Sequence, residues 1–232
     1  MQGPEDQHDG LSGAPHRGAD TRLRVLIVDD HTLFRTGLRN LLEDEGFEVA
    51  EARSGELALQ AAAARRPDVV LMDLNMPGIS GVEATRRLTE LAPATPVVML
   101  TVSADDRDVV DAVRAGACGY LLKDASIEEI ADSIRAVASG DSWVAPRVAG
   151  TLLAHVRGAS EPEPAAALEV ELTERETQIL RLIAEGKENA EIGAELYISP
   201  RTVKNHVSSL LAKLQIDNRI QAAVYAVRRG LV

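Results

Sequence analysis

The first 140 residues alternate short apolar runs with amphipathic stretches. The apolar runs have the composition of strands buried on both faces, and they lie at 23–28, 47–52, 69–72, 96–100 and 118–122. The stretches with helical periodicity lie at 31–45, 54–65, 80–91, 104–115 and 126–140. Strands that alternate with helices predict a three-layer α/β domain built on a parallel sheet.

From Leu172 onward the pattern is helical throughout. The third of these helices has an apolar face formed by Val203, Val207, Leu210, Leu211 and Leu214. The residues expected to cap the successive helices are Thr173, Asn189, Ser199 and either Asp217 or Asn218. Pro200 suits the first position of the third helix, where a missing N–H costs nothing. The pattern predicts a small all-α domain.

The segment between these two regions follows neither pattern. Residues 143–146 and 148–156 could form a short helix, and 158–164 are typical of a flexible, partly extended linker. Residues 1–22 are polar and rich in Gly and Pro. We therefore expect a disordered tail at 1–22, an α/β domain at 23–140, a linker at 141–167 and a helical domain at 168–232.

Charge separates the two predicted domains. The chain of 232 residues has a formal net charge of −11. From Leu168 to the end, nine Lys and Arg balance nine Asp and Glu, so the whole acidic excess precedes Leu168. Residues 199–232 hold six basic residues against Asp217 alone. An acidic N-terminal region and a basic C-terminal end indicate that the two predicted domains have different functions.

The composition also excludes several classes of protein. Cys118 is the single cysteine, so an internal disulfide and a Cys/His metal cluster are both excluded. No apolar run approaches the length of a membrane span, and the N-terminus has no apolar core typical of a secretory signal. We expect a cytoplasmic protein without a membrane partner.

Unusual polar residues follow four of the five predicted strands. They are Asp29, Asp30, Asp73, Thr101 and Lys123. Strand ends of a parallel sheet converge on one edge, where ligands bind. Carboxylates that lie close together repel one another, and a bound Mg²⁺ ion relieves this repulsion because it takes oxygen ligands. The ligands here would be two carboxylates and a backbone carbonyl near Asn75. Asp73 would then accept a phosphoryl group, with Lys123 and the Thr101 hydroxyl contacting phosphate oxygens.

The polar face of the third C-terminal helix suggests a nucleic-acid contact. Lys204, Asn205 and Ser208 share this face, with Arg201 near the helix start. Side chains of these types read base edges from a helix in the major groove. Other polar residues of the helix are expected to contact phosphate, namely Thr202, His206 and Lys213. The alternative is a small helical bundle that binds protein.

The N-terminal motifs resemble the receiver domain of two-component response regulators. The similarity covers residues 22–140 and rests on Val28-Asp29-Asp30-His31, Met72-Asp73-Leu74-Asn75-Met76-Pro77-Gly78, Thr101 and Lys123. It implies a five-stranded flavodoxin-like (βα)5 fold and phosphorylation of Asp73 by a histidine kinase. It also implies Mg²⁺ bound directly by Asp30, Asp73 and the Asn75 carbonyl, with Asp29 acting through water. Thr101 and Tyr120 would form the switch, in which Thr101 moves toward the phosphate and Tyr120 turns inward behind it.

The C-terminal motifs resemble the LuxR-type helix-turn-helix domain of NarL/FixJ response regulators, a four-helix fold. The similarity covers residues 172–232 and rests on Leu172-Thr173-Glu174-Arg175-Glu176, Gly186, Asn189, Glu191-Ile192, Leu196, Ser199, Thr202-Val203-Lys204, His206-Val207, Lys213-Leu214, Arg219, Ala222-Ala223 and Gly230-Leu231-Val232. Gly193 and Glu188 depart from the usual Ala and Ser, and neither departure removes a DNA contact. The resemblance places Lys204, Asn205 and Ser208 toward the bases. It also implies dimerisation through the last helix, near Ile220, Val224 and Val227.

Together these patterns predict a response regulator whose phosphorylation favours a DNA-binding dimer on two half-sites. Before phosphorylation, the receiver would cover the recognition helix or its dimer face. An alternative is a Mg²⁺-dependent phosphatase, but Asn75 stands where such enzymes need a second acid, so we expect no turnover enzyme. Further alternatives are a helical end that binds protein and a sensor for a small signalling lipid, although the chain has no aromatic-lined ligand domain.

Overall fold

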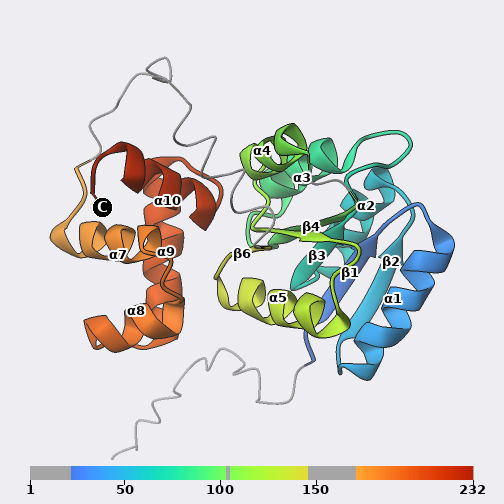
Figure 1. The fold of residues 1–232 in the computed structure, drawn as a ribbon, viewed down its shortest axis with the longest axis horizontal. Coiled ribbons are helices and arrows are strands. Elements are labelled where there is room, and N and C mark those ends of the chain that lie inside the picture. The colour runs from blue at the N-terminus through green and yellow to red at the C-terminus, as the bar shows by residue number, and fades with distance from the viewer. Residues whose placement is uncertain (1–21, 103–104, 146–170, 232) are drawn as a thin grey trace, which may run out of the picture.

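The computed structural model describes residues 22–102, 105–145 and 171–231 (Figure 1). Its strands are β1 (Arg24–Val28), β2 (Glu48–Ala52), β3 (Val69–Met72), β4 (Val97–Thr101), β5 (Gly119–Leu122) and β6 (Trp143–Val144). Its N-terminal helices are α1 (Thr32–Asp44), α2 (Gly55–Arg65), α3 (Gly81–Leu91), α4 (Asp106–Arg114) and α5 (Ile127–Ser139). Its C-terminal helices are α7 (Glu174–Ala184), α8 (Asn189–Leu196), α9 (Pro200–Leu214) and α10 (Arg219–Arg228).

The strands form one parallel sheet in the order β2-β1-β3-β4-β5-β6. Helices α1 and α5 cover one face, and α2, α3 and α4 cover the other (Figure 1). Every residue of β3 and β4 is buried, because helices pack on both sides of these strands. The three-layer α/β fold expected from the sequence is confirmed, and the sheet order is that of a flavodoxin-like domain.

The register of the sheet brings the strand ends together. Val28 of β1 lies beside Met72 of β3, and Met72 lies beside Met99 of β4. The Asp73 N–H donates to the Val28 carbonyl at 2.8 Å, which ties the residue after β3 to the end of β1. The residues that follow β1 and β3 therefore leave the sheet at the same edge.

Polar caps begin most of the described helices, as the sequence predicts. The predicted serine and threonine caps that accept a backbone N–H are Ser54, Ser80, Ser126, Thr173 and Ser199. Asn218, rather than Asp217, caps α10. The expectation that Asn189 caps α8 is wrong, because the N-cap is Glu188 and Asn189 is already the first helical residue. The Asn189 side chain is thereby left for contacts outside its own helix.

The C-terminal helices pack around a separate apolar cluster. Val203, Val207 and Leu210 of α9 are buried in it, and Leu211 and Leu214 pack against it. The apolar face predicted for this helix is therefore confirmed. A four-helix C-terminal domain follows the α/β domain, as expected.

Residues 141–145 differ from their sequence-based expectation. Trp143 and Val144 were expected in a short helix, but they form β6, which pairs in parallel with Gly119 and Tyr120 of β5. The backbone N–H of Trp143 donates to the Cys118 carbonyl at 3.2 Å. The segment therefore pairs with the edge of the sheet that β5 would otherwise leave open. The expected tail at 1–21 and the expected helix and linker residues at 146–167 lie outside the described residues.

None of the helices in the described ranges combines the length and the apolar character needed to cross a membrane.

The start of α3 lies against the backbone that follows β3. A β-carbon at Gly81 would lie 2.0 Å from the Asp73 carbonyl oxygen. Gly81→Ala is therefore expected to lower the free energy of unfolding by about 1–3 kcal/mol through overpacking, as measured by thermal or urea unfolding. Gly37→Ala is the matched control, because no atom lies within 4 Å of the added carbon in α1. A Gly81→Ala protein as stable as the wild type would contradict this close approach.

Candidate functional site

Four side chains gather at the carboxyl edge of the sheet, beside the ends of β1 and β3. They are Asp29, Asp30, His31 and Asp73, and each offers one ligand atom within 4.8 Å of the others. Asp29 and Asp73 are buried, with exposed fractions of 1% and 4%. The structure thus brings together the three carboxylates that the sequence predicts to converge.

Lys123, directly after β5, bridges two of these carboxylates. Its ammonium Nζ lies 2.6 Å from Asp29 Oδ2 and 2.9 Å from Asp73 Oδ2. The same ammonium lies 4.8 Å from the centre of the Phe34 ring, so α1 covers it from the side. Three carboxylates against one ammonium leave two negative charges in the pocket.

Burial and these ion pairs set the protonation of the site. Burial raises the pKa of the Asp73 carboxyl, and the Asp29 charge adds to the rise, although Lys123 opposes it. Burial by itself would lower the pKa of Lys123, but its bonds to Asp29 and Asp73 prevail and raise it. The lysine is therefore held charged, whereas the charge on Asp73 is disfavoured.

Thr101 and Tyr120 lie on the adjoining strands β4 and β5. Both are buried, with exposed fractions of 0% and 1%. Burial raises the pKa of the Tyr120 phenol, and the charges of Asp108 and Asp105 reinforce this effect. The resemblance implies that Tyr120 turns inward after phosphorylation. In this structure, the side chain is already enclosed.

The donor set fits a hard divalent cation. Asp30 Oδ1 is buried and makes no hydrogen bond of good geometry among the described residues; His31 Nδ1, 3.0 Å away on an exposed side chain, is the neighbour that a cation would displace. The two uncompensated negative charges match the charge of Mg²⁺, and carboxylate oxygens are its preferred ligands. Asn75 is exposed, and its backbone N–H donates to the Asp73 carboxylate.

Sequence reasoning overlooked two contributors to this site. His31 Nδ1 lies 3.0 Å from Asp30 Oδ1, although the sequence marks His31 only as part of a motif. Arg35 of α1 donates from Nη1 to the Asp29 carbonyl at 2.6 Å. The signal that could have indicated this contact is an arginine in the first turns of the helix that directly follows the acidic pair.

The polar face predicted for α9 is exposed in the structure. Arg201, Lys204, Asn205, Ser208 and Lys213 are exposed, whereas Thr202 and His206 are half-buried. Three of these side chains already have partners within the C-terminal domain. Ser208 Oγ donates to the Lys204 carbonyl at 3.0 Å. Thr202 Oγ1 lies 2.8 Å from the capping Ser199 hydroxyl, and Lys213 Nζ lies 2.7 Å from Glu176 Oε2.

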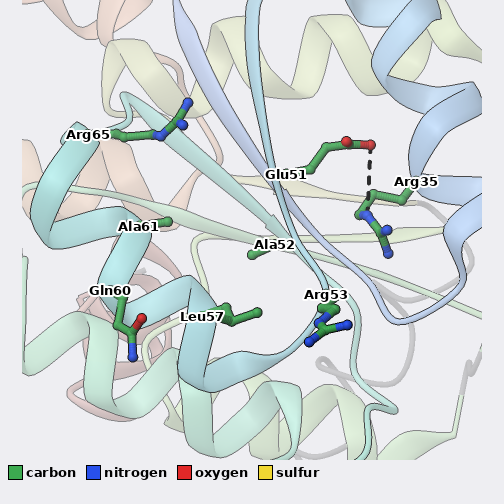
Figure 2. Close-up of a pocket in the computed structure, with 8 residues that line it drawn as sticks. All are labelled: Arg35, Glu51, Ala52, Arg53, Leu57, Gln60, Ala61 and Arg65. Atoms are coloured by element: carbon green, nitrogen blue, oxygen red, sulfur yellow. Dashed lines mark ion pairs between the residues drawn. The ribbon is translucent and has the colours of Figure 1, made fainter.

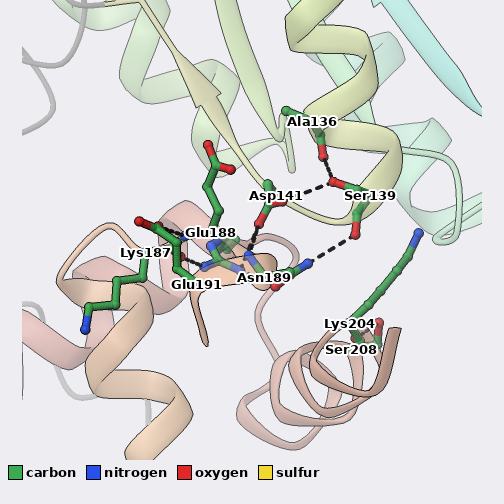
Figure 3. Close-up of polar contacts among 10 residues, drawn as sticks. Ala136, Ser139, Asp141, Lys187, Glu188, Asn189, Glu191, Lys204 and Ser208 are labelled. Carbon is green, nitrogen blue, oxygen red and sulfur yellow. Dashed lines mark hydrogen bonds and ion pairs between the residues drawn. The ribbon is translucent and has the colours of Figure 1, made fainter. Parts of the chain in front are cut away.

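Lys204 has its partner in the other domain. Its ammonium donates to the Ala138 carbonyl in the last turn of α5 at 2.7 Å. Carbonyl groups at a helix C-terminus have no partner within the helix and attract cations. Figure 3 shows Lys204 and Asn189 both reaching toward this end of α5. In this arrangement the Lys204 ammonium is engaged by α5.

Asn189 and Arg219 join the same contact. The Asn189 backbone donates to Asp141 Oδ1 at 2.9 Å, and its side-chain amide donates to the Ser139 carbonyl at 3.1 Å (Figure 3). Arg219 Nη1 donates to Asn189 Oδ1 at 2.9 Å and lies 3.5 Å from Asp141 Oδ1. Burial lowers the pKa of Arg219, although the charge of Asp141 partly offsets this effect.

A second contact links α10 to the end of α4. The side-chain amides of Asn218 and Gln221 both donate to the Val113 carbonyl, at 3.0 and 2.8 Å. The dimer residues predicted on α10 lie further along this helix. Ile220 and Val224 are half-buried, and Val227 is 44% exposed.

Two family models match the chain, one for each domain. Residues 25–135 match the response regulator receiver domain, and residues 170–226 match the bacterial regulatory proteins of the luxR family.

Known proteins with both parts are similar over nearly the whole chain. The transcriptional regulatory protein LiaR of Bacillus subtilis is 44% identical, over 90% of this chain and 99% of LiaR. The response regulator protein VraR of Staphylococcus aureus is 39% identical, again over 90% of this chain and 99% of the relative. A crystal structure of a LuxR-family two-component response regulator from Aurantimonas has a TM-score of 0.54 and 32% identity, over 56% of this chain and 95% of that one. This chain therefore belongs to the two-component transcriptional response regulators of the NarL/FixJ family, which join a receiver domain to a LuxR-type helix-turn-helix domain.

Proposed function

We propose that Asp73 accepts a phosphoryl group from a partner histidine kinase in the cytoplasm, and that this event controls DNA binding by α9. The observation that carries the proposal is the Lys123 ammonium held between Asp29 and Asp73 in a buried pocket at the strand ends. A buried carboxyl beside a fixed cation suits a group that is converted from a carboxylate to an acyl phosphate.

In the proposed transfer, an Asp73 carboxylate oxygen attacks the phosphorus of a phosphohistidine. The new O–P bond forms as the P–N bond breaks, and the imidazole nitrogen leaves with the electron pair. Lys123 is close enough to exchange its bond to Asp73 for one to a phosphoryl oxygen. Asp30, Asp73 and the Asn75 carbonyl would hold Mg²⁺, with Asp29 acting through water. When bound, the ion would neutralise charge on the carboxylates and the phosphoryl oxygens.

Phosphorylation would then act on the neighbouring strands. It places a group of about −1.5 to −2 charges at the end of β3, where an ionised carboxylate carries a single charge. The Thr101 hydroxyl, at the end of β4, would donate to the new phosphoryl group. Tyr120 lies on the next strand, which is followed directly by Lys123 and pairs with β6. A change at Asp73 therefore has a short packed route to the segment that carries Asp141.

We further propose that the arrangement described here is the form with low DNA affinity. The ammonium of Lys204 cannot contact a base while it donates to the Ala138 carbonyl. Phosphorylation would favour an open form that binds duplex DNA as a dimer, with Lys204, Asn205 and Ser208 toward the bases. Arg201, Thr202, His206 and Lys213 would contact phosphates. Ile220, Val224 and Val227 would form the dimer contact.

Asp73→Asn is expected to abolish phosphorylation, because an amide cannot accept the phosphoryl group. The measurement is incorporation of label from acetyl phosphate with Mg²⁺. Asp44→Asn, at an exposed position in α1, is the control and should retain full incorporation. Labelling that persists in Asp73→Asn would exclude Asp73 as the acceptor.

The same substitution is expected to raise the melting temperature at pH 7 without Mg²⁺. The folded-state pKa of Asp73 is raised above its usual value of 3.8, so ionisation at higher pH destabilises the fold. The gain should be absent well below pH 3.8, where the carboxyl is protonated in both states, should grow as the pH rises toward the folded-state pKa, and should level off above it. A stabilisation that is constant across this range would contradict the assigned cause.

Lys204→Ala is expected to weaken binding of the phosphorylated protein to duplex DNA by about tenfold, because a contact to a base edge is lost. The probe is a duplex fragment enriched from genomic DNA by the phosphorylated protein, and affinity is measured by gel shift. Arg87→Ala, at an exposed position of α3, is the control. Unchanged affinity in Lys204→Ala would refute the assignment of this face.

Asp141→Ala tests the proposed form with low DNA affinity, called the closed form here, in the same gel-shift assay. It removes the acidic partner of buried Arg219 and the acceptor of the Asn189 N–H, but no predicted DNA contact. Without Asp141, the buried Arg219 guanidinium lacks its acidic partner, which destabilises the closed form. When the domains separate, water can solvate this guanidinium. The apparent Kd of the unphosphorylated variant should therefore fall toward that of the phosphorylated protein. An unchanged Kd would show that the domain contact does not limit DNA binding.

A further inference from the structure

The turn that carries Asp29 and Asp30 is fixed by several of its own atoms. The Asp29 N–H donates to the Ala52 carbonyl of β2 at 3.1 Å. Its carboxylate accepts the His31 N–H at 2.7 Å and the Lys123 ammonium at 2.6 Å. The remaining polar group of Asp29 is its carbonyl oxygen, which accepts Arg35 Nη1 at 2.6 Å. Arg35 therefore completes the fixation of this residue.

Arg35 is itself held from β2. Its Nε lies 3.8 Å from Glu51 Oε1, and the other carboxylate oxygen of Glu51 lies 3.3 Å from Arg39 Nη1. Figure 2 shows Arg35 and Glu51 facing one another at an open pocket of about 530 Å³ beside the sheet edge. The Arg35 side chain is only 12% exposed, so water competes weakly for its guanidinium. Packing and charge thus restrict Arg35 to one orientation.

The Asp29 carbonyl matters because its peptide group leads directly into Asp30. Asp30 Oδ1 is buried, and its neighbour among the described residues is His31 Nδ1 at 3.0 Å, from a 69% exposed side chain on the same turn. Among the described residues, this oxygen has no hydrogen bond or ion pair from another element, so the backbone of its own turn contributes strongly to its position. A donor that fixes the preceding peptide plane restricts the directions that this carboxylate can take.

We propose that Arg35, held by Glu51, is a positioning residue for the cation site: it orients the Asp29–Asp30 peptide so that Asp30 meets a divalent ion. The inference rests on the proposed function, because it assumes that the acidic pocket binds Mg²⁺. Arg39 provides the contrast. It lies on the same helix and pairs with the same Glu51, but no contact joins it to Asp29 among the described residues. Stabilisation of α1 against β2 would involve both arginines, whereas positioning involves Arg35 alone.

The test is the Mg²⁺ dissociation constant of the full, unphosphorylated chain, measured by isothermal titration calorimetry. Arg35→Ala is expected to raise this constant about tenfold, as for loss of an outer contact in other metal sites. Arg35→Lys should recover part of the affinity, because an ammonium can still donate to the Asp29 carbonyl. Arg39→Ala should bind Mg²⁺ like the wild type, whatever its effect on the melting temperature.

Two outcomes would overturn the inference: wild-type affinity in Arg35→Ala, or an equal loss in Arg39→Ala. If Arg35→Ala does not fold, Glu51→Gln provides a second test. It weakens the hold on Arg35 and should raise the dissociation constant about threefold. An unchanged value there would also overturn the inference.

The proposed function fails separately. A wild-type chain that neither binds Mg²⁺ nor incorporates label at Asp73 would overturn both proposals. A wild-type chain that does both, with unchanged binding in the Arg35 variants, would overturn this inference alone.

Discussion

Three carboxylates share one buried edge of the sheet, and their mutual repulsion is the constraint around which this domain is built. Lys123 relieves part of it by bridging Asp29 and Asp73, and the surplus of two negative charges favours a divalent cation. The fold supplies the means to hold such charges. Parallel strands end at one edge, and backbone hydrogen bonds to Ala52 and Val28 fix the residues that follow them. The pocket therefore keeps acidic groups close together at the expense of stability, as active sites commonly do.

The contact between the domains is polar where the core of each domain is apolar. It consists of bonds from Lys204, Asn189, Asn218 and Gln221 to carbonyl or carboxylate groups of the receiver, together with the pair of Arg219 and Asp141. Water can replace each of these partners when the domains separate, and neither apolar cluster has to open. A small change in free energy at the receiver is then enough to shift the balance between closed and open forms.

The acidic pocket and this contact are linked by consecutive elements. Lys123 directly follows β5, and Tyr120 within this strand pairs with Val144 of β6, which lies shortly after Asp141 in the chain. Contiguity alone does not establish coupling. The proposed switch rests on one group with two partners: the Lys204 ammonium bonds to the end of α5 in this structure and would bond to a DNA base in the open form.

Local patterns in the sequence determined the elements, their caps and the identity of the acidic residues. Apolar runs predicted the five main strands, and Ser80, Ser126, Thr173 and Ser199 marked helix starts correctly, because these signals act within a few residues. Only the tertiary structure decided which partners distant residues take. Arg35 meets the Asp29 carbonyl, Trp143 joins the sheet edge, and Asn189 leaves its capping role to bind α5 and Arg219. Such contacts depend on how whole elements pack, and spacing along one helix or strand does not encode the geometry between elements.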